Sequence, residues 1–210
     1  MIVIVRHGNT FESGEIPRRI GARTDLPLTP KGLDQADALG AHFIRHGVHF
    51  ETVLVSPLLR TRQTAERILA QQPSAPETEI AQFLREIDYG PDENQPEDTV
   101  LARIGAPALE AWELRAEAPQ GWITAAKERI AAWRELFDRE RARHRETARA
   151  TNATLLVTSN GAARFALMAD PALNEAAKEL SSLKLPTGGM GTLSCAADGA
   201  LRLVKWGIRP

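Results

Sequence analysis

Short apolar runs that alternate with helical segments constrain this chain to an α/β fold. Residues 1–5, 52–55 and 154–158 are mostly apolar and rich in β-branched side chains, which is typical of buried strands. Helix-spaced apolar residues fill 30–47, and a second helical segment fills 56–72. Strands that alternate with helices predict a mostly parallel sheet flanked by helices on both faces.

The ends of the first two helices carry local signals. Thr29 followed by Pro30 is an N-cap with proline at the first helical position, and Gly47 is a plausible C-cap. Ser56 and Pro57 repeat the cap-then-proline pattern after the second strand, and we expect a helix to open there.

The second half predicts a further helix and a terminal hairpin. Apolar residues at steps of three and four start a core-facing helix at Ile123, and the charged stretch 138–149 is read as its solvated end. Residues 193–206 read as a hairpin. We expect a single domain over 1–210, with a helical insertion over about 77–150 that forms a lid.

Composition excludes several classes of partner. A net charge of −1 gives no pull toward nucleic acid or an anionic membrane. No apolar run approaches the roughly 20 residues of a membrane span, and the N-terminal run is too short for a signal peptide. The single cysteine, Cys195, cannot form an internal disulfide, which favours a reducing compartment. We therefore expect a cytoplasmic protein; its oligomeric state is left open.

Three predicted strands end in residues that suit an anionic ligand. Arg6, His7 and Gly8 follow the first strand, Arg60 lies just beyond the second, and Asn160 follows the third. Open α/β sheets bind ligands at the carboxyl ends of their strands. Guanidinium groups donate bidentate hydrogen bonds to phosphate, and a neutral imidazole can act as a nucleophile. The sequence predicts a phosphate site at this edge, although the first tripeptide alone also fits an ordinary strand end.

Four segments together resemble the histidine phosphatase superfamily, also called phosphoglycerate mutase-like. Residues 6–10, Arg-His-Gly-Asn-Thr, resemble its signature. Residues 25–36 are similar to its D-x-P-L-T-x-x-G-x-x-Q-A stretch, and 56–65 to its S-P-x-x-R-x-x-Q-T-A stretch. Residues 84–90 resemble the segment that carries the acid. The resemblance is strong up to about residue 90 and returns at the third strand.

The resemblance implies a mechanism. His7 would attack phosphorus and form a phosphohistidine, while Arg6 and Arg60 would hold the phosphoryl oxygens. Glu86 would protonate the leaving oxygen and then help to deprotonate water, with Asp88 as the competing acid. The family mechanism uses no metal and no cofactor, because the arginines supply the positive charge.

The resemblance also implies contacts to a small phosphorylated substrate. Asn9 would donate an amide hydrogen bond to phosphate. Arg23 either contacts the substrate or faces solvent, and Tyr89 is a candidate wall of the substrate pocket. The family usually has a histidine where this chain has Asn160. A neutral donor contributes about 0.5–1.5 kcal/mol where a charged one contributes about 1.5–3. The difference is roughly a tenfold loss of rate.

Other assignments stay open. His42 and His46 have a metal-ligand spacing but also suit a helix C-terminus. Trp112 and Trp122 are candidate pocket walls or core residues. For function we expect a phosphomonoester hydrolase. The alternatives are mutase-type phosphotransfer, which needs a second phosphate position, and non-catalytic binding of a phosphorylated ligand.

Overall fold

One mixed sheet organises the protein. The computed structural model describes residues 1–146, 153–196 and 198–210. Within these residues six strands pair in the order β3-β2-β4-β1-β5-β6. β1 to β4 run parallel, and β5 and β6 add an antiparallel hairpin. The strands are β1 (Ile2–Arg6), β2 (Phe50–Val55), β3 (Thr78–Ile80), β4 (Ala153–Thr158), β5 (Met190–Cys195) and β6 (Leu201–Ile208). The predicted mostly parallel sheet and terminal hairpin are confirmed.

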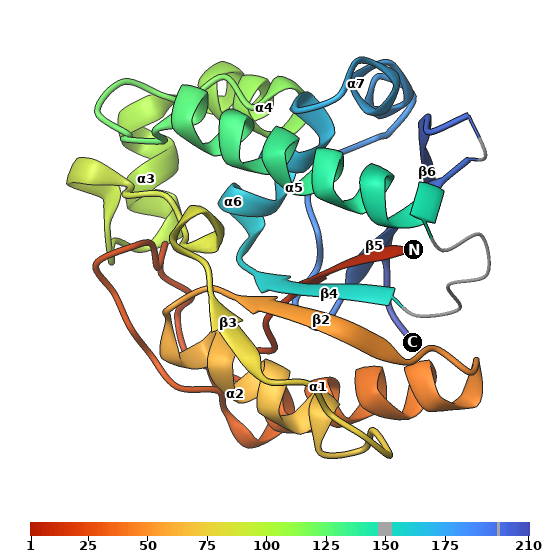
Figure 1. Cartoon of the computed structure of the whole chain (residues 1–210). Coiled ribbons are helices and arrows are strands. Elements are labelled where there is room, and N and C mark those ends of the chain that lie inside the picture. Colours follow the sequence, from red (N-terminus) through yellow and green to blue (C-terminus); the bar gives the residue numbers. More distant parts are fainter. Residues whose placement is uncertain (147–152, 197) are drawn as a thin grey trace.

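Helices cover both faces of the sheet, as predicted (Figure 1). In the described part of the chain the α-helices are α1 (Pro30–Arg45), α2 (Leu59–Leu69), α3 (Glu97–Ile104), α4 (Ala106–Arg115), α5 (Ala126–Glu146), α6 (Asn160–Met168) and α7 (Pro171–Ala177). Two short 3-10 turns, Gln82–Leu84 and Gly90–Asp92, lie between β3 and α3. None of the described helices is long and apolar enough to cross a membrane.

The two faces of the sheet build two separate clusters of buried side chains. Successive side chains of a strand point to opposite faces, so the apolar run of β1 supplies both. Val3 and Val5 belong to the cluster that includes residues of α1 and α2. Ile2 and Ile4 belong to the cluster that includes residues of α5 and α6. A continuous apolar run is therefore what a strand buried on both sides requires.

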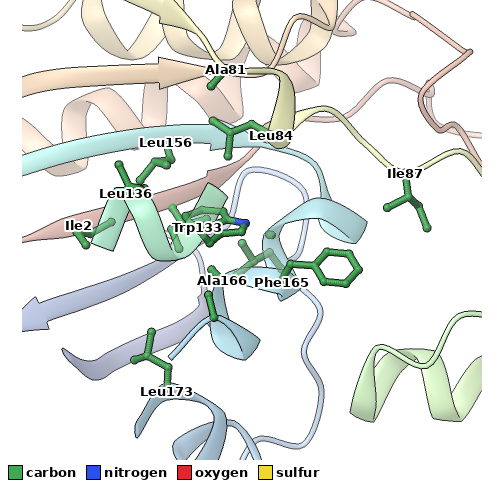
Figure 2. Packing of buried hydrophobic residues seen from close by; sticks show 14 of the residues in the cluster. Ile2, Ala81, Leu84, Ile87, Trp133, Leu136, Leu156, Phe165, Ala166 and Leu173 are labelled. Carbon is green, nitrogen blue, oxygen red and sulfur yellow. The ribbon is translucent and has the colours of Figure 1, made fainter. Parts of the chain in front are cut away.

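A large aromatic side chain anchors the second cluster. Trp133 of α5 is fully buried, and Figure 2 shows it beside Leu136 over Ile2 and Leu156 of the sheet. Its ring meets Phe137 at 5.7 Å between centroids. Burial of such a side chain contributes more than any single hydrogen bond in this region. The cluster fixes α5 over the strands whose ends carry the site.

The strand register brings the predicted site segments together. β4 lies between β1 and β2, with Arg6 opposite Thr158 and Val55 opposite Val157. Because the three strands are parallel and in step, their carboxyl ends are level. The expected convergence of three strand ends at one edge is confirmed.

Some predicted boundaries hold and one does not. Thr29 caps α1 by accepting a hydrogen bond from the backbone N–H of Gly32 at 3.2 Å, and Gly47 follows the helix at φ +64°. The predicted helix start at Ser56 is wrong. The N–H of Ser56 still donates to Val157 of the sheet, and α2 begins at Leu59.

The predicted start of the later helix is also wrong. Ile123 pairs with Asp88 in an isolated antiparallel bridge and is 64% exposed, so α5 begins only at Ala126. The charged stretch 138–149 continues α5 as far as Glu146; its remainder lies outside the described residues. The same holds for the end of the predicted insertion, 77–150. Its helices α3 and α4 lie at the end of the sheet where β1 and β4 finish (Figure 1).

Candidate active site

A cavity of about 590 Å³ opens at the carboxyl ends of β1 and β4. Residues from both strand ends, the loop after β1, helix α4 and the segment before β5 line it. The lining residues include Arg6, His7, Asn9, Arg19, Glu86, Tyr89, Leu109, Trp112, Glu113, Asn160, Arg164 and Lys184. Five of the residues that sequence patterns assigned to phosphate chemistry line this cavity together with residues of α4: Arg6, His7, Asn9, Glu86 and Asn160. Arg60 is not among the lining residues and contacts the site through His7.

His7 is buried and held in one tautomer. Its Nδ1 lies 2.7 Å from the carbonyl oxygen of Gly8. A carbonyl oxygen can only accept, so Nδ1 carries the proton and Nε2 keeps its lone pair. Arg60 donates its Nε–H to that Nε2 at 3.2 Å. The imidazole thus presents an unprotonated nitrogen next to a cation.

The surroundings of His7 keep the ring neutral. Burial lowers its pKa well below the ordinary value of 6.5, and the charges of Arg60 and Arg6 lower that pKa further. The hydrogen bond to Gly8 opposes these effects. Burial and cations both disfavour a protonated ring, so the nucleophilic form predominates at neutral pH.

The two arginines are fixed by backbone carbonyls. Arg60 is fully buried in the first turn of α2, and its Nη groups donate to the carbonyls of Gly21 and Thr24. Arg6 donates from Nη1 to the carbonyl of Leu185 at 2.7 Å. Within the described residues, the buried Nε of Arg6 has no hydrogen-bond partner. An oriented, unpartnered N–H beside His7 suits an oxygen of a phosphoryl group.

Glu86 is the buried acid of the cavity. Its Oε1 accepts from the N–H of Ile87 at 2.8 Å, and its Oε2 accepts from the N–H of Gly161 at 2.9 Å. Gly161 stands in the first turn of α6, whose N-terminus favours a carboxylate. A Cβ at Gly161 would lie 2.3 Å from Oε1, so the close approach requires glycine.

The competing acid, Asp88, occupies a different place. It forms an ion pair with Arg23 and accepts from the N–H of Gly90 at 2.7 Å. In the described part of the chain neither Asp88 nor Arg23 lines the cavity. Arg23 is about half exposed, and its Nη2 donates to the carbonyl of Gly90 at 2.6 Å. The expected contact of Arg23 with substrate therefore finds no support in the geometry.

Asn160 and Asn9 both line the cavity. The Oδ1 of Asn160 accepts from the N–H of Leu185 at 3.0 Å, so the amide NH₂ is the end left to donate. The backbone of Asn9 is held from both sides: its N–H donates to Gln35, and its carbonyl accepts from the N–H of Thr29. The side-chain amide of Asn160 and the backbone of Asn9 are thus positioned by contacts with residues that are distant in sequence.

The aromatic residues take different roles. Tyr89 and Trp112 line the cavity and are buried, whereas Trp122 packs behind them with ring centroids 4.8 Å and 5.4 Å away. Trp122 also donates Nε1–H to Asp92 at 2.6 Å. Burial raises the pKa of the Tyr89 phenol, and the charge of Glu86 raises it further. Trp112 is therefore both a core residue and part of the cavity wall, whereas Trp122 is a core residue behind that wall.

His42 and His46 contact each other on α1, with ring centroids 4.2 Å apart. The Nδ1 of His46 lies 2.8 Å from the carbonyl oxygen of His42, a bond across one helical turn. Across the described residues no group of three or more histidine, cysteine, aspartate or glutamate side chains could hold a metal ion. The pair is thus arranged as residues near a helix C-terminus.

Sequence reasoning missed Arg164, a fully buried arginine that lines the same cavity. It lies four residues after Asn160 on α6, so both side chains share one helix face. That spacing is a signal that the sequence did contain.

Comparison with known proteins agrees with this geometry. The family model described as histidine phosphatase superfamily (branch 1) matches residues 2–209. A 2,3-bisphosphoglycerate-dependent phosphoglycerate mutase of Sinorhizobium fredii is 29% identical over 119 residues, which cover 56% of this chain and 56% of that protein. A fructose-2,6-bisphosphatase of Danio rerio is 37% identical over 99 residues, 46% of this chain and 37% of that protein. The chain thus spans about half the length, or less, of these curated relatives.

The fold itself is shared over the whole chain. The native structure of a mycobacterial glucosyl-3-phosphoglycerate phosphatase superimposes with a TM-score of 0.77. The alignment covers 100% of this chain and 99% of that one at 20% sequence identity.

Proposed function

The chain belongs to the histidine phosphatase superfamily, and we propose that it is a phosphomonoester hydrolase that works through a phosphohistidine at His7. The observation that carries this proposal is the fixed tautomer of His7. Nδ1–H is bound to the carbonyl of Gly8, and Nε2 keeps a lone pair beside Arg60 in a cavity. A binding protein for phosphate has no need of an unprotonated imidazole nitrogen at that point.

In the first half-reaction, Nε2 of His7 attacks phosphorus and the P–O ester bond breaks. The Nε–H of Arg60, which now faces Nε2, becomes a donor to a phosphoryl oxygen, and Nε of Arg6 donates to another. Glu86 gives its proton to the departing ester oxygen, which leaves as an alcohol. The arginines thereby stabilise the charge on the transferring group.

In the second half-reaction, a water molecule attacks the phosphohistidine and the N–P bond breaks. Glu86, now a carboxylate, accepts a proton from that water. Inorganic phosphate leaves, and His7 returns with a free Nε2. The neutral state of His7 is favoured again by burial and by the two cations.

Asn160 takes the place of the family's usual second histidine in this proposal. Its NH₂ donates to a phosphoryl oxygen while its Oδ1 stays bound to the N–H of Leu185. Asn9, two residues after His7 in the chain, donates in the same way. A neutral amide stabilises the transition state less than an imidazolium does, so we expect slower turnover than a histidine would support.

Phosphotransfer between two positions of a substrate is the second candidate. It is favoured by a relative of 29% identity that is named a phosphoglycerate mutase. It requires that the phosphohistidine outlive an encounter with water, which a cavity partly walled by α4 would assist. Transfer of the phosphoryl group to a second hydroxyl, in place of release of inorganic phosphate, would identify phosphotransfer.

The test combines trapping with turnover. Phosphate release is measured over a panel of phosphomonoesters, and the enzyme is denatured in alkali during turnover and mapped by mass spectrometry. We expect a phosphoryl group on His7 of the wild type. In His7→Ala we expect neither this phosphorylation nor release of phosphate. His42→Ala is the matched control, because His42 lies on α1 outside the lining of the cavity. This variant should keep both the phosphorylation and the turnover. Turnover that survives His7→Ala refutes the mechanism. Tight binding of phosphate by the wild type, with neither phosphorylation of His7 nor turnover, identifies a binding protein.

A further inference from the structure

Glu93 is a carboxylate behind the cavity, and the proposed reaction assigns it no role. It follows directly after the 3-10 turn Gly90–Asp92 and is partly buried. Its Oε1 accepts three hydrogen bonds, from the N–H of Gly21 at 2.9 Å, the N–H of Arg23 at 3.0 Å and the hydroxyl of Thr24 at 2.7 Å. One oxygen atom therefore binds three of four consecutive residues in the loop between β1 and α1.

The inserted segment fixes the position of this carboxylate. The Oε2 of Glu93 accepts from the N–H of Tyr89 at 3.1 Å. The preceding residue, Asp92, is buried and accepts from the Nε1–H of Trp122 at 2.6 Å. Asp92 also accepts two hydrogen bonds from the guanidinium of Arg103. Glu93 is thus presented by a turn that is itself anchored by buried contacts.

The loop of residues 21–24 packs against Glu93 without room for a side chain at its first residue. Gly21 is buried, and a Cβ placed on it would lie 2.2 Å from Oε2 of Glu93 and 2.6 Å from the carbonyl oxygen of Ile87. The N–H of Ala22 donates to that same carbonyl at 2.9 Å. Glycine at position 21 therefore lets the carboxylate reach the backbone N–H groups of the loop.

The same loop holds Arg60 through its carbonyl groups. The carbonyls of Gly21 and Thr24 accept from Nη2 and Nη1 of Arg60 at 3.1 Å and 2.7 Å. With both Nη atoms held in this way, the Nε–H of Arg60 donates to Nε2 of His7 at 3.2 Å. Two residues of the loop, Gly21 and Thr24, thus bind Glu93 through their donors and Arg60 through their acceptors.

Glu93 also acts on Arg60 through its charge. Burial lowers the pKa of the Arg60 guanidinium, while the charge of Glu86 and, more weakly, that of Glu93 raise it. A nearby carboxylate therefore favours the cationic form that a phosphoryl group requires. Neither Arg60 nor Glu93 is among the described residues that line the cavity. Any effect of Glu93 on the reaction must therefore pass through the loop and Arg60.

We propose that Glu93 is a positioning residue, which fixes the loop of residues 21–24 and thereby aims Arg60 at Nε2 of His7. This inference rests on the proposed function, in which Arg60 stabilises the transferring phosphoryl group. Without the carboxylate, the N–H groups of Gly21 and Arg23 lose their shared acceptor, and the carbonyls that hold Arg60 are free to turn. A catalytic group is only as well placed as the contacts that support it.

The experiment compares two substitutions of Glu93 in the full chain. Glu93→Ala removes the acceptor, whereas Glu93→Gln keeps one oxygen that can accept from the loop. We measure kcat/KM on the best phosphomonoester of the panel and Kd for inorganic phosphate by calorimetry. We expect Glu93→Ala to lower kcat/KM by about 10- to 100-fold and to weaken Kd by about tenfold, because Arg60 is misplaced. Glu93→Gln should recover most of both losses.

The pH dependence of kcat/KM gives a readout that partial unfolding would not move. Burial lowers the pKa of His7, and the charges of Arg60 and Arg6 lower it further. Arg6 is held by the carbonyl of Leu185, so a change at Glu93 should leave it in place. If Arg60 withdraws, the pKa of His7 rises, and the acid limb of the profile moves to higher pH. We expect this shift in Glu93→Ala and a smaller one in Glu93→Gln.

A second background tests whether Glu93 acts through Arg60. In an Arg60→Met protein, Glu93→Ala should change kcat/KM by less than about twofold, because the side chain that Glu93 positions is already gone. Asp98→Ala is the matched control, because Asp98 is an exposed carboxylate in the first turn of α3 that accepts hydrogen bonds from Thr99. This control should keep the kcat/KM, the Kd and the acid limb of the wild type.

The outcomes distinguish this inference from the proposed function. Unchanged kcat/KM and an unmoved acid limb in Glu93→Ala overturn the role of Glu93 and leave hydrolysis standing. An equal loss in the Arg60→Met background, or a loss that Glu93→Gln does not recover, assigns Glu93 a general structural role and also overturns it. If circular dichroism shows that Glu93→Ala does not fold, an unmoved limb in Glu93→Gln overturns the inference. Absence of phosphate release from every ester by the wild type overturns the proposed function and the inference together.

Discussion

Replacing Gly161 by alanine should displace Glu86, the proposed acid, and leave His7, the proposed nucleophile, in place. The added Cβ would stand 2.3 Å from Oε1 of Glu86, 3.1 Å from its Cδ and 3.2 Å from Cγ1 of Ile87. Ordinary contacts between such atoms lie near 3.5 Å, so the carboxylate must retreat by about 1 Å. His7, Arg6 and Arg60 are not among the three nearest atoms that the new methyl group meets.

The expected cost is kinetic more than thermodynamic. A misplacement of about 1 Å at a catalytic group can cost about 10²-fold in rate, and general acid catalysis contributes about 10²–10⁴-fold. Alanine has the higher helix propensity, by about 0.5–1 kcal/mol, which offsets part of the steric strain at the start of α6. We therefore expect a folded enzyme with kcat reduced about 10²-fold.

The assay uses the leaving group to identify the step. An alkyl phosphate needs a proton on its departing oxygen, whereas 4-nitrophenolate leaves without one. We expect Gly161→Ala to reduce kcat/KM for the alkyl ester far more than for 4-nitrophenyl phosphate. Thermal unfolding, followed in parallel, should change little.

A double-mutant cycle gives the refutation. If Gly161→Ala acts through Glu86, it should add little to the loss already caused by Glu86→Gln, because the two changes remove one interaction. Additive losses, or equal losses on both leaving groups, would show that Gly161 matters for another reason.

Three further predictions follow from the same contacts. Because Arg60 lowers the pKa of His7, Arg60→Met should shift the acid limb of the kcat/KM–pH profile to higher pH, which a pH series checks; an unmoved limb contradicts the electrostatic reasoning. Asn160→His should raise turnover about tenfold in steady-state assays, and an unchanged or lower rate would count against its role. Thr29→Ala, which removes the cap on Gly32, should lower the free energy of unfolding by about 1 kcal/mol in a urea titration; no change would contradict capping.

The fold was predictable where local chemistry and burial agree. β1 is apolar on both faces because it is covered on both, and Thr29 caps α1 as its sequence position predicts. β3 was missed because Thr78–Ile80 is an exposed edge strand with no apolar alternation. Ile123 has the right spacing for a helix but pairs with Asp88, so a distant backbone contact overrides the local pattern.

The site was predictable through its motifs and not through its contacts. Arg6, His7 and Glu86 carry patterns that are readable along the chain, and the structure places all three on one cavity. Among the residues that the structure describes, the buried Nη2 of Arg164 has no hydrogen-bond partner, and this depends on how α4 packs against α6, which no local pattern reveals. Sequence motifs thus identify the chemistry, while packing between distant segments determines which charges stay available.

Leu185 accepts a hydrogen bond from Arg6 at its carbonyl and donates one to Asn160 from its N–H. A single buried residue is therefore bonded to the side chains of both Arg6 and Asn160, which follow from two strands that pair directly in the sheet. A shift of this residue should therefore disturb the positions of the Arg6 guanidinium and the Asn160 amide together. Changes in the length of the segment just before β5 should accordingly be poorly tolerated.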